Sequence, residues 1–284
     1  MRSRFFQYLG KRLARIYPIY WLYTLAVLLL FAVLYRQFYS LSHILRSLTL
    51  FPFHTELGEF PVIPPAHTLT YEIIFYIIFG LGIIVGRRMF AGLMLLWLAL
   101  ILLNMFWANG LFNGVFGAVI FNPINFEFFY GCCIAWLLVS KPLMLSRRQA
   151  IVLFWTAVIL LLIAWISQLN NFGVLLQQQY LKFGIPFSLI IYSVSVFEQS
   201  KKQSFLKKLF VKLGDASYSI YLLHYTGIHV LNNTIFAKMP WLSSSHRLLL
   251  CLILITIGSL ILYKWVEEPL INFFNRKLLL RSTK

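Results

Sequence analysis

Long apolar runs constrain the fold of this chain more than any other feature. A run of about 20 apolar residues spans the roughly 30 Å hydrocarbon core of a bilayer as a helix. Eight runs near this length can be read, at 16–35, 68–85, 89–107, 124–139, 150–166, 183–197, 217–236 and 248–266. The fourth and sixth are short, and either could begin several residues earlier. We therefore predict an all-α fold, a polytopic transmembrane helix bundle of about eight helices.

Composition supports a membrane protein and excludes most soluble classes. The chain is 60% hydrophobic and 12% charged, with a mean hydropathy of +0.79, whereas an average soluble domain is about 25% charged. We find no internal repeat and no soluble domain, so residues 1–284 are predicted to form a single transmembrane domain in the lipid bilayer. The first apolar run is too long for a signal peptide and lacks a small-residue cleavage site, so we expect it to remain as a membrane helix.

The positions of Lys and Arg predict the orientation of the bundle, because these residues collect in short cytoplasmic loops. With the N-terminus inside, 20 of the 25 basic residues fall on the cytoplasmic side, and the others are Arg36, Arg46, Lys182, Lys238 and Arg247. Both termini are therefore predicted to be cytoplasmic, and the 36–67 connection extracytoplasmic. The net charge of +17 then reflects topology, and we predict no nucleic-acid partner because no basic soluble domain exists to present one. The three cysteines lack metal-ligand spacing, so we predict no metal site and no bound cofactor.

A polar stripe interrupts the apolar helix that begins in the sequence LGDASYSIYLLH, residues 213–224. At about 100° per residue, one side of this helix carries several polar side chains, and two more lie at its edge: Ser217, Tyr221, His224, Tyr225 and Asn232, with Tyr218 and His229. Such residues can simply hydrogen-bond to neighbouring helices. An ionisable histidine inside a membrane span is, however, a functional candidate, and both interpretations stay open.

Two further patterns carry chemistry. Thr68, Glu72 and Tyr76 are spaced by four and share one face of a predicted helix. Glu72, which we place just below the outer surface, is either stabilised by the helix dipole or available as a base for a hydroxyl group. Arg12 and Arg15 precede a helix that we expect to start around Pro18. They are either topology markers or a bidentate site for phosphate at the cytoplasmic face.

Four segments, in order along nearly the whole chain, resemble the integral membrane acyltransferase family three, which includes bacterial O-acetyltransferases of envelope glycans. RLARIYPIYW is similar to its Arg-x-x-Arg-Ile-x-Pro signature, and HTLTYEIIFYIIF to its Trp-Ser/Thr-Leu-x-x-Glu-x-x-Phe-Tyr helix. LGDASYSIYLLH resembles its Leu-Gly-x-x-Ser-Tyr-Ser-x-Tyr-Leu-x-His segment, and VEEP, at 266–269, resembles its closing Val/Ile-Glu-x-Pro.

The resemblance implies an enzyme of the bacterial inner membrane that moves an acyl group, with acetyl expected, from cytosolic acyl-CoA to a hydroxyl of an extracytoplasmic glycan or glycolipid. It implies that Arg12 and Arg15 hold the phosphates of coenzyme A. Glu72 and His224 would be the catalytic residues of this chain. The other implied substrate-binding residues are His67, Tyr71, Tyr76, Ser217, Tyr218, Tyr221 and Glu267.

Two departures from the family accompany the resemblance. The family has about ten helices, and its first two, which carry an Arg-Gly pair and the usual catalytic histidine, precede the arginine signature that starts here at Arg12. We therefore expect the chain to be truncated at its N-terminus and, alone, to show little or no acyl transfer. His67 stands where the family usually has tryptophan. A non-catalytic scaffold, and a transporter for a glycan or lipid intermediate, stay open as alternatives.

Overall fold

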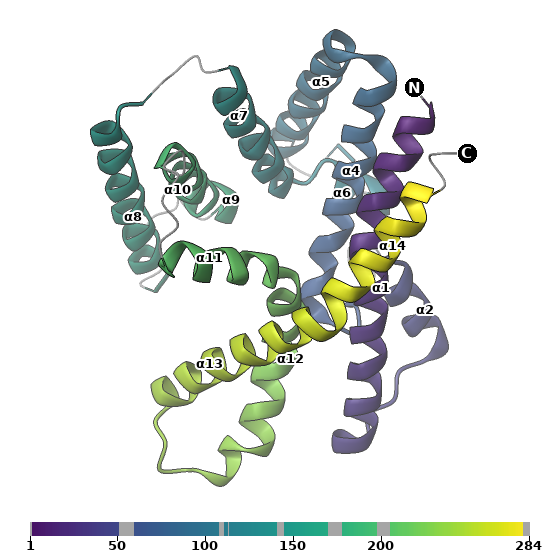
Figure 1. Cartoon of the computed structure of the whole chain (residues 1–284), viewed down its shortest axis with the longest axis vertical. Helices are drawn as coiled ribbons and strands as arrows, with labels where there is room; N and C mark the ends of the chain where they lie inside the picture. Colours follow the sequence, from purple (N-terminus) through teal and green to yellow (C-terminus); the bar gives the residue numbers. More distant parts are fainter. Residues whose placement is uncertain are drawn as a thin grey trace. The chain divides into compact units, whose positions relative to one another are not determined.

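The computed structural model describes residues 2–50, 60–107, 111–112, 114–140, 145–169, 178–197 and 205–280, and most of these residues are helical, with no β-strand among them. They form two compact units (Figure 1). The first unit comprises residues 1–93, 114–119 and 204–284, and the second comprises 94–113 and 120–203. The all-α helical fold predicted from the apolar runs is confirmed.

The first unit carries the motifs singled out from the sequence. Its helices are α1 (Arg2–Tyr35), α2 (Leu41–Thr49), η1 (Pro64–Ala66), α4 (His67–Val85), most of α6 (Val115–Ile120), α11 (Phe205–Asp215), α12 (Ser217–Thr234), η4 (Phe236–Lys238), α13 (Ser244–Leu262), the π-helical turn η5 (Tyr263–Glu267) and α14 (Glu268–Leu280). α4 and α14 both pack against α1, and α12 packs against α13.

The second unit holds most of α5 (Arg87–Phe106), then η2 (Pro123–Asn125), α7 (Phe126–Ser140), α8 (Arg147–Leu169), α9 (Gln179–Lys182) and α10 (Gly184–Phe197). α10 packs against both α7 and α8. The indole of Trp97 donates to the carbonyl of Ile120 at 2.7 Å, and the ring of Tyr180 stacks on Phe126. None of the sequence-predicted site residues lies in this unit.

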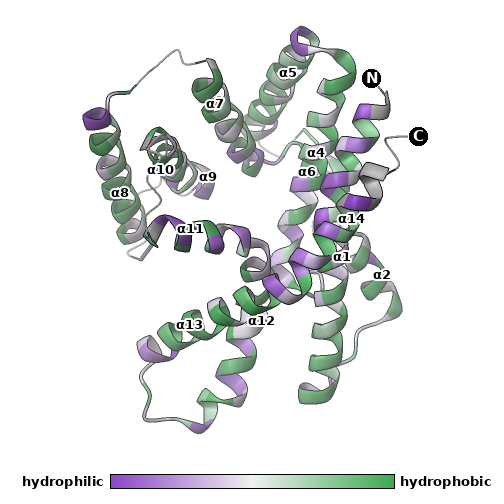
Figure 2. Cartoon of the chain, viewed as in Figure 1, coloured by the Kyte–Doolittle hydropathy of each residue, from purple (hydrophilic) through white to green (hydrophobic). Residues whose placement is uncertain are grey.

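Within the part of the chain that the structure describes, six helical segments are long and apolar enough to cross a membrane: Arg4–Tyr35, Pro64–Val85, Arg87–Phe106, Val115–Ser140, Arg147–Gln168 and Ser244–Phe274. Each contains or overlaps one of the eight predicted spans, and the fourth begins earlier, as the sequence allowed. The other two predicted spans are helical, but α10 has 14 residues and α12 is rich in polar side chains. Figure 2 shows apolar residues along most of α5, α8 and α13. The protein is multi-pass, while the count of eight and the side of each terminus stay predictions.

The start of the first helix was predicted wrongly. α1 begins at Arg2 and continues through Pro18, rather than starting around that residue. The upstream turns are held by α4, because Phe5 and Tyr8 lie against Gly80, where a Cβ atom would stand 2.8 Å from the ring of Phe5. This packing outweighs the loss of the one helical hydrogen bond that a proline cannot make.

The connection after α1 turns back along that helix. Ser40 caps α2 by accepting from the amide of His43. The side chains of Tyr20 and Trp21 then donate to the carbonyls of Ser47 and Leu48, both at 2.8 Å. α4 therefore begins beside the middle of α1 and not beyond its C-terminal end. Residues 51–59 lie outside the described residues.

Candidate functional site

The first turn of α12 is hydrogen-bonded to two other elements, α1 and η5. The hydroxyl of Tyr218 donates to the carbonyl of Ile16 in α1 at 3.0 Å. Ser219 is fully buried; its hydroxyl donates to Glu267 Oε2 at 2.5 Å and accepts from the hydroxyl of Tyr23 at 3.1 Å. These polar contacts link α1, α12 and η5 inside an otherwise apolar core, which contains Ile16, Ile19, Tyr20 and Leu222.

Tyr221 connects α12 to the start of α4. Its hydroxyl lies 2.5 Å from Thr68 Oγ1 and donates to the carbonyl of Pro65 in η1. The Thr68 hydroxyl also lies 3.4 Å from the carbonyl of Pro65, so the two hydroxyls share this acceptor and either one can donate to the other. The predicted polar faces of 68–85 and 217–236 thus meet at Thr68 and Tyr221.

Glu72 and Tyr76 form a second polar contact on α4, where the Tyr76 hydroxyl donates to Glu72 Oε1. The guanidinium of Arg12 lies over the rings of Tyr8 and Tyr76, at 5.6 and 5.3 Å from their centroids. Glu72 thus lies within one turn of a tyrosine that contacts the arginine-bearing part of α1. Its depth below the outer surface stays a prediction.

The two predicted catalytic residues, Glu72 and His224, are not joined by a hydrogen bond in the described structure. His224 is half-buried, and its Nδ1 lies 2.6 Å from the carbonyl of Tyr221. A carbonyl only accepts, so Nδ1 carries the proton in this contact, and Nε2 is the ring nitrogen that can accept. A ring nitrogen in that state can serve as a base.

His67 and Tyr71 lie at the start of α4, on the same turn as Thr68. His67 Nδ1 is 2.9 Å from the carbonyl of Pro64, and its ring packs edge-on against Phe60. Tyr71 is buried. The contacts of His67 help to hold the start of α4 in place, and the substrate-binding role that the resemblance implies for both residues stays a prediction.

The polar stripe of α12 does not coincide with its most buried side. Ser217 is exposed and Tyr225 is 53% exposed, whereas Ser219, Leu222 and Thr226 are buried. The rotation of about 100° per residue predicts which residues of a helix share a face. It does not predict which face neighbouring helices cover, and here α13 and α1 pack against α12 on the side that includes Ser219, Leu222 and Thr226. Ser219 was therefore missed as a site residue, although it belongs to the same segment.

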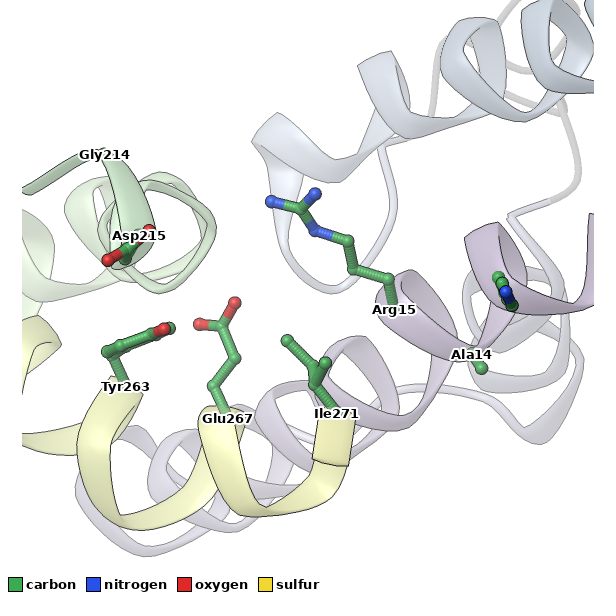
Figure 3. Close-up of a pocket in the computed structure, with 8 residues that line it drawn as sticks. Ala14, Arg15, Gly214, Asp215, Tyr263, Glu267 and Ile271 are labelled. Carbon is green, nitrogen blue, oxygen red and sulfur yellow. The ribbon is translucent and has the colours of Figure 1, made fainter. Parts of the chain in front are cut away.

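A cavity of about 280 Å³ opens beside this polar cluster (Figure 3). It is lined by Lys11, Ala14, Arg15, Gly214, Asp215, Tyr263, Glu267 and Ile271. Arg15, Asp215, Tyr263 and Glu267 converge on it from α1, α11 and η5. Glu267 and Arg15 were predicted from the sequence. Asp215 and Tyr263 were missed, because spacing within one helix says nothing about contacts between helices that are 200 residues apart. Lys11 was counted only among the basic residues that set topology, although its spacing of four from Arg15 places both on one helix face.

The structure separates the two signature arginines. Arg15 lines the cavity and is exposed, whereas Arg12 is half-buried between Tyr8 and Tyr76. The cation beside Arg15 in the cavity is instead Lys11, one helical turn earlier on α1. Two cations on one exposed helix face, opposite two carboxylates, form a mixed-charge site.

Comparison with known proteins gives one result for this chain. The family model described as an acyltransferase domain, family 3, matches residues 2–264. The matched region includes α1, α4 and α12, and it ends before Glu267. No curated protein and no solved structure matches the chain.

Proposed function

The chain belongs to acyltransferase family 3, and from this membership we propose that it moves an acyl group, with acetyl expected, from cytosolic acyl-CoA to a hydroxyl of an envelope glycan or glycolipid. At the coarser level it is a multi-pass membrane acyltransferase, an enzyme that transfers groups other than aminoacyl groups. The proposed location is the bacterial inner membrane.

The observation that carries the proposal is the cavity on α1 that combines Arg15 and Lys11 with the buried polar contacts of α12. Guanidinium and ammonium groups on an accessible surface suit the phosphates of a nucleotide-linked donor. From Glu267 the polar contacts continue through Ser219 to Tyr23, within a core that is otherwise apolar. A charged donor can thus be held at one end, while the acyl group enters a less polar interior.

The proposed reaction needs a base and no redox partner. The hydroxyl oxygen of the acceptor attacks the thioester carbonyl, a C–O bond forms, and the C–S bond breaks. The hydroxyl proton passes to the base and then to the departing thiolate, so atoms and charges balance. We assign the base to His224, whose Nε2 is free to accept, and we assign Glu72, which already accepts from Tyr76, to a polar contact with the acceptor.

The test measures transfer of labelled acetyl groups from acetyl-CoA to membrane glycans in a host without a related enzyme. It compares parent and variant at equal protein levels, in a form of the chain that transfers label. Replacing His224 with Ala should lower the transferred label about 100- to 10,000-fold, the usual contribution of a positioned base. Glu72→Gln should lower it less.

His246 offers a matched control, because it is an exposed histidine at the start of α13. The His246→Ala variant should transfer label as the parent does. Equal transfer by parent and His224→Ala, at equal protein levels, would overturn the assignment of the base. Label that enters no glycan in any form of the chain would overturn the proposed acceptor.

A further inference from the structure

Glu267 is a buried carboxylate that is only half satisfied. Its side chain is 1% exposed. Oε2 accepts from Ser219 at 2.5 Å, but Oε1 has no hydrogen-bond partner among the described residues. An unpaired buried polar atom costs free energy, more so for a charged group, and such atoms are rare in folded proteins. The free oxygen therefore points to a partner that the chain itself does not supply.

The backbone around Glu267 is also unusual. Residues Tyr263–Glu267 form a π-helical turn between α13 and α14. Turns of this kind are uncommon and are often found at functional sites. Both ends of this turn, Tyr263 and Glu267, line the cavity shown in Figure 3.

The same cavity carries two cations. Lys11 and Arg15, one helical turn apart on α1, line it together with Glu267. The cavity thus combines a carboxylate oxygen that has no donor among the described residues with two cations. A ligand that satisfies both must carry an anionic group together with an O–H or N–H donor a few bonds away.

We propose that this cavity binds the phosphopantetheine arm of the acyl donor, with its hydroxyl donating a hydrogen bond to Glu267 Oε1 and its phosphate contacting Lys11 and Arg15. In that arm the hydroxyl lies a few bonds from the phosphate, so both groups can enter the one cavity that Lys11, Arg15 and Glu267 line. The inference rests on the proposed function and adds the part of the donor that is recognised and the residue that recognises it. Ser219, held by Tyr23, orients the carboxylate so that Oε1 faces the ligand.

The direct test is binding of 4′-phosphopantetheine to the full chain in lipid nanodiscs, measured by calorimetry. Replacing Glu267 with Gln leaves one acceptor oxygen where there were two, and Ser219 occupies one. We expect the dissociation constant to rise about 10- to 100-fold, the loss of one hydrogen bond to a charged group. Glu268→Gln is the matched control, since this neighbouring carboxylate is exposed and does not line the cavity, and it should bind as the parent does.

A comparison of two ligands needs no protein variant, so it tests the proposed hydrogen bond even if Glu267→Gln fails to fold. The parent chain should bind 4′-phosphopantetheine about 10- to 100-fold more tightly than an analogue in which the hydroxyl is replaced by hydrogen. Equal binding of the two compounds by a chain that binds acetyl-CoA would overturn the inference and leave the proposed function standing. A parent chain that binds neither acetyl-CoA nor 4′-phosphopantetheine would overturn both.

Discussion

At the scale of single residues, the site depends on a few hydrogen bonds between helices, and Tyr221 is the clearest case. Replacing it with Phe removes its donation to Pro65 and its contact with Thr68. Hydrogen bonds between membrane helices contribute about 0.6 kcal/mol on average and up to about 1.7 kcal/mol. We expect Tyr221→Phe to lower the unfolding free energy of the purified protein by about that range.

Tyr225 provides the control for this change, because it lies one turn later on α12 and is 53% exposed. Tyr225→Phe removes the same hydroxyl from the same helix and should leave thermal stability in detergent unchanged. Equal losses in the two variants would show that the contact of Tyr221 with α4 does not hold the helices together.

Individual residues were predicted with uneven success. Glu72, Tyr76 and Thr68 do share one face of α4, because the spacing of four fixes this within a helix. The partners of these residues were not predictable. Arg12 meets Tyr76, and Ser219 meets Glu267, only because three distant segments pack together. Periodicity carries no information on which helix faces which.

At the scale of elements, close packing of α4 against the start of α5 depends on a glycine. A Cβ atom at Gly82 would stand 2.6 Å from Cδ2 of Phe90. Overpacking of this kind costs about 1–3 kcal/mol. We expect Gly82→Ala to lower the melting temperature of the protein in detergent, measured as the loss of the monodisperse peak after heating.

Gly92 is the matched position, since it is also helical and a Cβ atom there would meet nothing within 4 Å. Because alanine is the better helix former, Gly92→Ala should leave the melting temperature unchanged or raise it. If Gly82→Ala were as stable as Gly92→Ala, the close approach of Phe90 to α4 would be wrong.

The elements themselves were the most predictable part of the structure. Each apolar run became a helix, since a bilayer leaves few other ways to satisfy the backbone. The boundaries were less predictable. α1 starts at Arg2, well before Pro18, because Phe5 and Tyr8 pack on α4. The amphipathic helix α11 lies between the predicted spans 183–197 and 217–236, where no helix was predicted.

At the scale of the whole molecule, the orientation in the membrane follows from charge. Only five of the 25 basic residues fall on the predicted outer side. Alkaline phosphatase fused after Pro61 should therefore be active, and the same reporter fused after residue 284 should be silent. The reverse pattern would place the cavity at Arg15 on the outer face and would remove the cytosolic donor from the account.

The central claim is that an acyl-CoA donor binds at the N-terminal half of α1, and its most direct test is the affinity of the nanodisc-embedded chain for acetyl-CoA. Replacing both Arg12 and Arg15 with Gln should weaken binding strongly. Lys at both positions should also weaken it, because a point charge does not reproduce a bidentate guanidinium. Arg15→Gln alone should weaken it more than Arg12→Gln, since only Arg15 lines the cavity. The exposed pair Arg147 and Arg148, changed to Gln, should bind as the parent does, whereas unchanged binding in the correctly inserted Arg12 and Arg15 double variant would contradict the account.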